Sequence, residues 1–476
     1  MTKKPFIPGA VFVVGLAAFI GSGPAVVSSG APEPLPPPRV KGFTAFRFQG
    51  ASSCAMAACH NAPGAPGAPG SEYATWAAAP RGDRPGDKHA QAYDVLTNDR
   101  SRFIAANLKR GKPAHQDSLC LNCHVVTDHD LVKERLPSFF TTDGVSCESC
   151  HGPAERWLAE HYRPEWKALK REEKAAYGMK DMRSLPARAK VCAACHVGSL
   201  PAEKGGVGQD AYHDLYAAGH PPLVFEFAAY HATTLHHWQD ARDKDPRQGG
   251  TPDFEARAWV AGQIVSAQAA LYLLGQRAAD AARPWPEFAE MDCFACHHDL
   301  KGKSWRQKRD ADSPPRKAGV MPFRPWYVAM LERSLETLDK GEAKSVHEEL
   351  ESLRKRMEKT VPDRGAVSRQ AKSLSSKLGP WLDKCDRAID LDSLYQRIRK
   401  EDVPRARENW DTAAQTYLAV AALENAWNDL QVTATHGNLP STLDAVRREL
   451  RWPKGYWSPP AFDGLSVLKK LERLRN

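Results

Sequence analysis

The feature that most constrains this chain is a cysteine–histidine motif that occurs five times between residues 54 and 297. Each copy has two cysteines, and a histidine directly follows the second one. Two residues separate the cysteines in four copies, and four residues separate them in the first copy. The cysteines are Cys54 and Cys59, Cys120 and Cys123, Cys147 and Cys150, Cys192 and Cys195, and Cys293 and Cys296, and the histidines are His60, His124, His151, His196 and His297.

The four short copies have the spacing C-x-x-C-H, which is typical of covalent attachment of c-type haem. Two thiols on one helical turn can each form a thioether with a haem vinyl group, and the histidine is then held under the iron as its proximal ligand. The first copy can still reach both vinyl groups through a bulged turn. We therefore predict five covalently bound haem c groups.

Two other uses of paired cysteines are a disulfide framework and tetrahedral zinc sites. Neither requires a histidine after every second cysteine, so both are disfavoured for the short motifs. For the first motif the alternative is a Cys54–Cys59 disulfide. The eleventh cysteine, Cys385, belongs to no motif and is expected to be a buried, inert thiol.

The distal ligands are expected among the remaining histidines, because seventeen less five proximal ones leave twelve. His89 begins an expected helix, His161 follows the third motif by ten residues, and His220 lies in a Gly-His-Pro turn that can aim it inward. The candidate distal ligands are His89, His161, His220, His231, His236 and His237. Further residues considered are His213 in the same cluster as the last three, His115, His129 and His298 beside motifs, and Met179 and Met182.

The N-terminus has the order of a secretory signal. Two lysines precede an apolar run at residues 10–20 and a small-residue stretch at 21–31, which predicts a signal peptide over residues 1–31. No charge follows the lysines until Glu33, so an uncleaved membrane anchor is the alternative, although prolines interrupt the run. We expect a periplasmic or otherwise extracytoplasmic protein, with membrane contact only if this segment stays uncleaved.

The rest of the chain predicts a mainly α-helical fold, because 42% of residues are hydrophobic and few segments alternate with period two. We expect short helices and loops around five stacked haems, followed by a haem-free helical domain. Apolar periodicity predicts longer helices at 254–280 and 405–430 and shorter ones at 366–398, 441–451 and 465–474. The expected divisions are a Pro-rich linker at 32–42, a pentahaem domain at 43–300, a basic linker at 301–316 and a helical C-terminal domain at 317–476.

The charge pattern argues against nucleic acid as a partner. The formal charge is +9, but 66 basic residues are scattered among 57 acidic ones without a dense basic stripe. Five haems would bring ten propionates, so we interpret the basic excess as propionate compensation. The sequence has no P-loop and no G-x-G-x-x-G motif, so nothing supports a nucleotide site.

Residues 48–200 resemble the cytochrome c five-fifty-four family, the tetrahaem cytochromes that take electrons from hydroxylamine oxidoreductase. The resemblance includes Gly50 before the first motif and Lys88-His89-Ala90 after it. Its sharpest part is the sequence GVSCESCHGP at residues 144–153 around the third motif. The resemblance implies a multihaem c-type cytochrome.

The resemblance also implies specific ligand pairs. By analogy with the family, His89 would face His151, and His161 would face His60. The haem on His124 would lack a strong sixth ligand. The chain departs from the family in its longer first motif and in its fifth motif with the region that follows. Pentahaem nitrite reductases share this packing style, but they carry a lysine in place of one proximal histidine, and no C-x-x-C-K occurs here.

Two functions are consistent with these motifs. The first, which we favour, is a non-enzymatic electron carrier in which closely packed bis-histidine haems transfer electrons between redox partner proteins. The alternative is an oxidoreductase that acts on a small nitrogen or sulfur compound, such as nitrite, hydroxylamine or nitric oxide, at an open iron on His124 with His115, His129 and Asp130 nearby. The C-terminal helices are expected to serve as a docking module within a larger respiratory complex.

Overall fold

The computed structural model describes most of the chain after residue 45. The described residues are 46–79, 86–126, 140–200, 208–297, 320–431, 439–451 and 462–475. The predicted signal peptide, the Pro-rich linker and the basic linker lie outside these residues, as do His129 and His298. Residues 38–476 form one compact unit.

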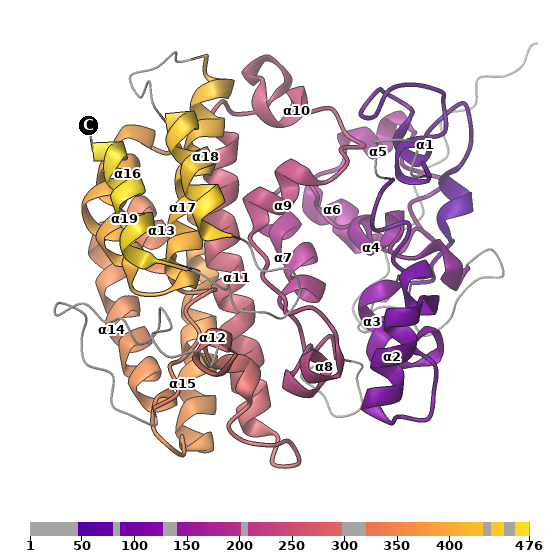
Figure 1. Ribbon diagram of the computed structural model, residues 1–476. Coiled ribbons are helices and arrows are strands. Elements are labelled where there is room, and N and C mark those ends of the chain that lie inside the picture. Colours follow the sequence, from indigo (N-terminus) through magenta and orange to yellow (C-terminus); the bar gives the residue numbers. More distant parts are fainter. Residues whose placement is uncertain are drawn as a thin grey trace, which may run out of the picture. The chain divides into compact units, whose positions relative to one another are not determined.

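The prediction of a mainly α-helical fold is confirmed (Figure 1). The described ranges contain no β-strand, and isolated bridges join Ser199 with Gln209 and Met291 with Phe323. The helices up to the fifth motif are α1 (Glu72–Trp76), α2 (Asp99–Leu108), α3 (Ser118–His124), α4 (Cys147–His151), α5 (Pro164–Ala168), α6 (Arg171–Ala176), α7 (Leu185–His196), α8 (His213–Ala218), α9 (Phe227–Thr233), α10 (Ala241–Lys244), α11 (Phe254–Ala279) and α12 (Cys293–Cys296). The later helices are α13 (Leu331–Leu338), α14 (Lys340–Met357), α15 (Arg364–Lys377), α16 (Leu391–Arg397), α17 (Trp410–Asp429), α18 (Leu439–Leu450) and α19 (Gly464–Leu471).

Helix α11 is the long helix predicted at residues 254–280, but it differs from the expected amphipathic one. It packs against α7 and α9 as well as against α13, α15 and α17, so side chains on all of its faces are buried. Its length and composition would suffice to cross a membrane, yet 78% of its most apolar stretch is buried inside the fold. It therefore serves as the central core helix of the described unit.

The C-terminal helices share one hydrophobic core with α7, α9 and α11. Trp326 stacks on Trp410 with ring centroids 5.9 Å apart, and its indole N–H donates to the carbonyl of Phe225, which precedes α9. Cys385 is buried at the end of a short 3-10 helix, as its predicted inert role requires. The division of the chain into a haem domain and a separate helical domain at 317–476 stays a prediction.

Candidate functional site

Four of the five motifs lie on helices. Helix α3 ends at His124, α7 ends at His196, and α4 is the third motif itself. Helix α12 contains Cys293 and Cys296, and the N–H of His297 donates to the carbonyl of Cys293 over 2.8 Å. Residues three apart on a helix lie on the same side of it, so the two thiols of each of these four motifs share one side of their helix.

The first motif takes up its two extra residues in a turn. Cys54 ends the 3-10 helix Ala51–Cys54, and the backbone N–H groups of Cys59 and His60 both donate to the carbonyl of Met56, over 2.9 and 3.1 Å. Although four residues separate the two cysteines, this turn folds Cys59 and His60 back toward Met56, which lies just after the 3-10 helix. Cys54 and Cys59 do not form a disulfide with each other in the structure.

Four motif histidines each lie opposite a histidine from elsewhere in the chain. An imidazole nitrogen binds a transition metal at about 2 Å and lies about 1 Å from its ring centre, so two imidazoles on opposite sides of one iron have centroids about 6 Å apart. The observed separations fit one haem iron between the rings of each pair. The pairs are His60 and His161 at 6.0 Å, His196 and His89 at 6.3 Å, His151 and His237 at 6.3 Å, and His297 and His213 at 6.3 Å.

The remaining motif histidine, His124 of the second motif, lies near the helix that presents His220. Burial lowers the pKa of His220. Leu215 and Ala218 of α8 form a hydrophobic cluster with Ile104, and Leu119 of α3, the helix of the second motif, packs against it. His220 follows Gly219, whose φ of 126° is a backbone conformation that glycine adopts readily. The N–H of His220 donates to the carbonyl of Leu215, which folds the residue back against the end of α8.

Hydrogen bonds on Nδ1 leave Nε2 available for a metal in several of these histidines. The Nδ1 atom of His124 donates to the carbonyl of Ala92 over 2.7 Å, and that of His161 donates to the carbonyl of Leu158 over 2.7 Å. The Nδ1 atom of His220 bonds the carbonyl of Pro221, and that of His60 bonds a carboxylate oxygen of Glu72 over 3.1 Å. Such contacts fix ring orientation and are typical of histidines that ligate metals.

Burial also keeps several of these imidazoles neutral. It lowers the pKa of His151 and of His196 to about 4. It lowers the pKa values of His124 and His237 as well. Neutral imidazole is the form that binds a metal, because protonation occupies the ligating nitrogen.

Two distal candidates from the sequence have other contacts. His236 uses both ring nitrogens, since Nδ1 bonds Asp240 and Nε2 bonds the carbonyl of His231, over 2.7 and 2.8 Å. The Nε2 atom of His231 accepts from Arg188 over 2.8 Å, and Arg188 also pairs with Asp243. The structure therefore places these histidines in a polar cluster beside the segment that carries His237, rather than opposite a motif histidine.

Thiols of different motifs lie next to each other. A hydrogen bond between Cys54 and Cys147 lowers the pKa of Cys54 and raises that of Cys147. A hydrogen bond between Cys123 and Cys195 raises the pKa of Cys123 and lowers that of Cys195. The first motif thus lies beside the third, and the second beside the fourth.

Two buried side chains hold these neighbouring motifs together. The amide of Gln209 donates to the carbonyl of Asn122 in the second motif and to the sulfur of Cys195 in the fourth, over 2.8 and 2.9 Å. The carboxylate of Glu148 in the third motif accepts from the N–H groups of Gln49 and Gly50, just before the first motif. The paired motifs are therefore fixed by polar contacts as well as by apolar packing.

The ligand pairing differs in two respects from the sequence-based expectation. The resemblance implies that His89 faces His151, whereas His89 lies opposite His196 in the structure. His213 was not among the distal candidates, yet its ring lies opposite that of His297. The available signals for His213 were its place in the histidine cluster and its seven-residue spacing from His220.

The donor set fits haem better than zinc. Among the described residues, no three His, Cys, Asp or Glu side chains gather into a group that could hold a metal ion alone. A haem iron needs only two ligands from the protein, because the porphyrin supplies the other four. Histidines in pairs beside paired thiols match that requirement.

Comparison with known proteins gives one match. Residues 54–152 match the family described as cytochrome c554 and c-prime. This segment contains the first three motifs. No curated protein and no solved structure matched the chain.

Proposed function

We propose that this chain, which matches the cytochrome c554 and c-prime family over residues 54–152, is a c-type cytochrome that carries electrons through five covalently bound haem c groups. The proposal extends the matched segment, which holds three motifs, to the fourth and fifth motifs on α7 and α12. The haems would be attached by the ten motif cysteines. Each motif histidine would hold its iron from one side.

The observation that carries the proposal is the opposition of motif and non-motif histidines about 6 Å apart. His60 with His161, His196 with His89, and His151 with His237 each offer the two axial ligands of one iron. We assign His220 to the iron on His124, because α8 and the second motif's helix α3 meet at one hydrophobic cluster and the Nδ1 atom of His220 is already bonded. With both axial positions filled by the protein, these irons have no open site.

A bound haem supplies a one-electron couple between ferric and ferrous iron. The chain's own residues set the conditions for this couple. Burial around His151 and His196 lowers their pKa values and so favours the neutral, ligating form, and the carboxylate of Glu72 against His60 raises the basicity of that ligand. An electron carrier needs these positioning groups and no side chain that donates or accepts a substrate proton.

The contacts between motifs support a continuous path. Glu148 joins the third motif to the residues before the first, Gln209 joins the second motif to the fourth, and α4 of the third motif packs against α7 of the fourth. The attachment points therefore follow the order first, third, fourth, second. This order predicts that electrons move between the first and second haems by way of the other two.

The alternative function is oxidation or reduction of a small nitrogen or sulfur compound. It requires a haem iron with a free sixth coordination position, and the iron held by His124 is the candidate. The family resemblance favours an open site there, whereas the place of His220 at the end of α8, next to the helix of the second motif, favours a closed one. His115 lies near the ring of Tyr93 and bonds Gln116. The spin state of the iron on His124 decides between the two functions.

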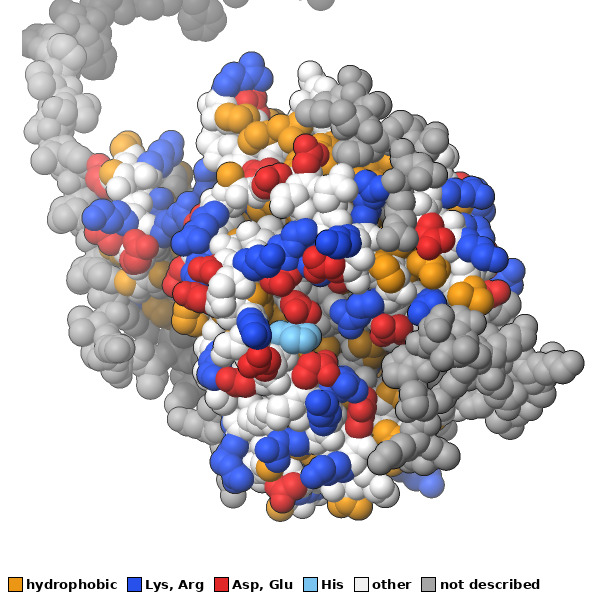
Figure 2. Space-filling view, turned by 90° about the vertical axis from the view of Figure 1, so that its left-hand side faces the viewer, with side chains coloured by type: hydrophobic (Ala, Val, Ile, Leu, Met, Phe, Trp, Pro, Cys, Tyr) orange, Lys and Arg blue, Asp and Glu red, His pale blue; other side chains and the backbone are white. Residues whose placement is uncertain are grey.

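Export, membrane contact and partners form the remaining parts of the proposal. The order of residues 1–31 supports an exported protein whose haems are attached outside the cytoplasm. We propose redox proteins as partners, with the C-terminal helices as a docking module. On the side of the molecule with α14, α16 and α19, basic and acidic side chains are interspersed (Figure 2), so we expect docking there to depend only weakly on salt.

The test is a haem count by pyridine haemochrome together with low-temperature electron paramagnetic resonance of the oxidised full-length protein. Five haems with low-spin ferric signals alone are the expected result. A high-spin signal of about one haem in five would support the oxidoreductase. Four haems would show that the first motif carries none, and N-terminal sequencing of the mature protein would test cleavage of residues 1–31.

A further inference from the structure

Helix α8 has a histidine at each end. His213 is its first residue, and His220 follows the turn at its C-terminal end. The ring of His213 lies 6.3 Å from that of His297 in the fifth motif. Leu215 and Ala218 of α8 share a hydrophobic cluster with Ile104 of α2, and Leu119 of the second motif's helix α3 packs against that cluster. One short helix thus reaches toward two different motifs.

We propose that α8 bridges two haems, with His213 as the distal ligand of the iron on His297 and His220 as the distal ligand of the iron on His124. The inference rests on the proposed five-haem function and deepens it. It places the fifth haem beside the second one, at the end of the row that runs through the first, third and fourth.

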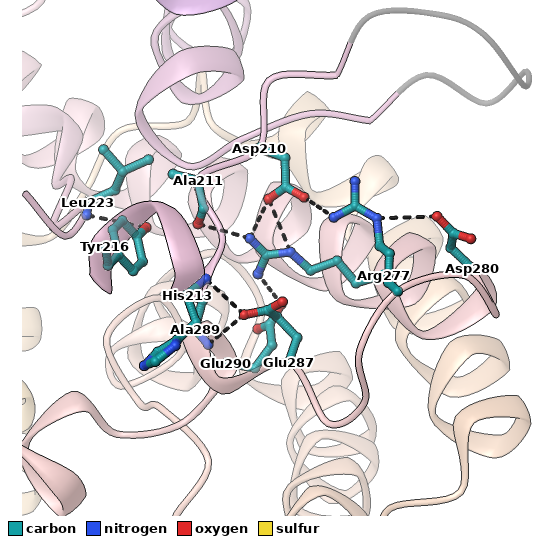
Figure 3. A network of polar contacts seen from close by, with 11 residues as sticks. Asp210, Ala211, His213, Tyr216, Leu223, Arg277, Asp280, Glu287, Ala289 and Glu290 are labelled. Atoms are coloured by element: carbon teal, nitrogen blue, oxygen red, sulfur yellow. Dashed lines mark hydrogen bonds and ion pairs between the residues drawn. The ribbon is translucent and has the colours of Figure 1, made fainter. Parts of the chain in front are cut away.

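The start of α8 is fixed to the fifth motif by a buried polar network (Figure 3). The backbone N–H of His213 donates to Glu287 over 2.9 Å, and the same carboxylate accepts from the N–H of Ala289, just before the motif. Arg277 of α11 pairs with Asp210 on one side and with Glu290 on the other. The same buried contacts therefore fix both the segment that carries His213 and the segment that carries the fifth motif. They hold the ring of His213 close to the ring of His297.

The end of α8 is fixed independently, by α2. The guanidinium of Arg100 donates to the carbonyl of Gly219 over 3.0 and 3.2 Å, and the amide of Asn107 donates to the carbonyl of Ala218 over 2.9 Å. A Cβ atom on Gly219 would lie 3.1 Å from Ile104 of α2. The turn that presents His220 thus has a separate set of contacts from the residues that position His213.

The length of α8 keeps the two sites close. Helical residues rise 1.5 Å each, so the two histidines, seven positions apart, lie within about 10 Å of each other along the helix. The distal sides of the second and fifth haems would then face the same helix. The charge state of one haem would then change the potential of the other through their electrostatic interaction.

The first test replaces each α8 histidine by methionine in the full-length holoprotein. His213→Met and His220→Met should each convert one haem from bis-histidine to histidine–methionine ligation, which adds a near-infrared sulfur-to-iron band and raises the potential of that haem. His236→Met is the matched control and should leave the spectrum unchanged, because His236 bonds Asp240 and the carbonyl of His231. Should a methionine variant lose its haem, the alanine variant with added imidazole serves, and imidazole should restore the low-spin signal.

The second test asks whether the two sites are neighbours. A redox titration of the His213→Met/His220→Met double variant, followed at the sulfur-to-iron band, should deviate from the sum of the single-variant curves. A curve equal to that sum would overturn the bridging role of α8. Unchanged ligation in His213→Met with five haems present would overturn the assignment of His213, whereas a wild-type count other than five would instead contradict the proposed function.

Discussion

The imidazole rings of His60 and His161 lie nearly parallel, 15° apart in plane with centroids 6.0 Å apart, although one belongs to the first motif and the other follows the third. The other pairs differ from this geometry. The planes cross at 79° for His89 with His196 and at 74° for the pair at His151. The orientation of axial ligands is therefore not uniform within the molecule.

This difference predicts two kinds of low-spin signal. Parallel imidazole planes split the iron d orbitals strongly and give a rhombic spectrum, whereas perpendicular planes give a signal with one very large g value. A His161→Met substitution should reduce the rhombic bis-histidine signal by one haem and leave the large-g signals unchanged. Electron paramagnetic resonance at low temperature measures both, and loss of a large-g signal instead would contradict the pairing with His60.

The single cysteine outside the motifs predicts the thiol count. Burial raises the pKa of Cys385 to about 12, so this thiol should not react in the native protein. If all five motifs carry haem, a thiol reagent should find no reactive cysteine before unfolding and one afterwards. Three thiols after unfolding would mean that Cys54 and Cys59 are not attached to haem.

Arg277 is expected to be a strong determinant of stability. It is buried and pairs with Asp210 over 2.5 Å and with Glu290 over 2.6 Å. An Arg277→Leu substitution would leave Glu290 buried without its counter-charge, so it should cost about 3–5 kcal/mol in the free energy of unfolding. Thermal unfolding of the holoprotein measures the loss, and Arg247→Ala, which removes an exposed ion pair with Asp245, should have no measurable effect.

Gly144 should tolerate no side chain, because it lies against the backbone of His89. Its φ is 64°, and a Cβ atom there would lie 2.7 Å from the carbonyl oxygen of His89. Gly144→Ala should therefore destabilise the protein by about 2–4 kcal/mol and perturb the haem signal of the His89 pair. Gly249→Ala is the matched control, since Gly249 also has a positive φ but faces open space; an equal loss in both variants would mean that the contact has no effect.

Glu226 predicts a pH dependence of stability. Burial raises its pKa from 4.5 to about 7, although it accepts hydrogen bonds from the N–H groups of Ala228 and Ala229 and contacts Gln263, with Glu255 nearby. The folded protein binds this proton more tightly than the unfolded one, so wild-type stability should fall as the pH rises from 4.5 to 7. Glu226→Gln should remove that fall and be more stable by up to about 3 kcal/mol at pH 8. Urea unfolding at a series of pH values measures the free energy of unfolding of both proteins. An equal change of this free energy with pH in the two proteins would contradict a raised pKa of Glu226.

Local structure was largely predictable from the sequence, because nearby residues determine it. The helix predicted at 254–280 is α11, Phe254–Ala279, and the one at 441–451 is α18. The helix predicted at 366–398 is interrupted, since Gly379 and Pro380 end α15 and a 3-10 helix follows. The turn residues were visible in the sequence, but apolar periodicity alone continues through them.

The pairing of histidines was less predictable, because it depends on tertiary contacts. His237 was one of three clustered candidates, and only the polar contacts of His231 and His236 separate it from them. His213 acquires its position from Glu287, which lies 74 residues further along the chain. No spacing rule in the sequence connects such residues, whereas the attachment motifs themselves are local and could be recognised.

Helix α11 has a consequence for how the irons change charge. Its two sides are buried by different parts of the chain, α7 and α9 on one and α13, α15 and α17 on the other. A chain shortened to residue 300 would expose the second side to water. The C-terminal helices therefore restrict movement of α11 and of the helices packed on it. A structure restricted in this way changes little when a haem iron gains or loses an electron. The reorganisation energy of the haem on His196, which ends α7, should accordingly be small, and this favours fast transfer in either direction.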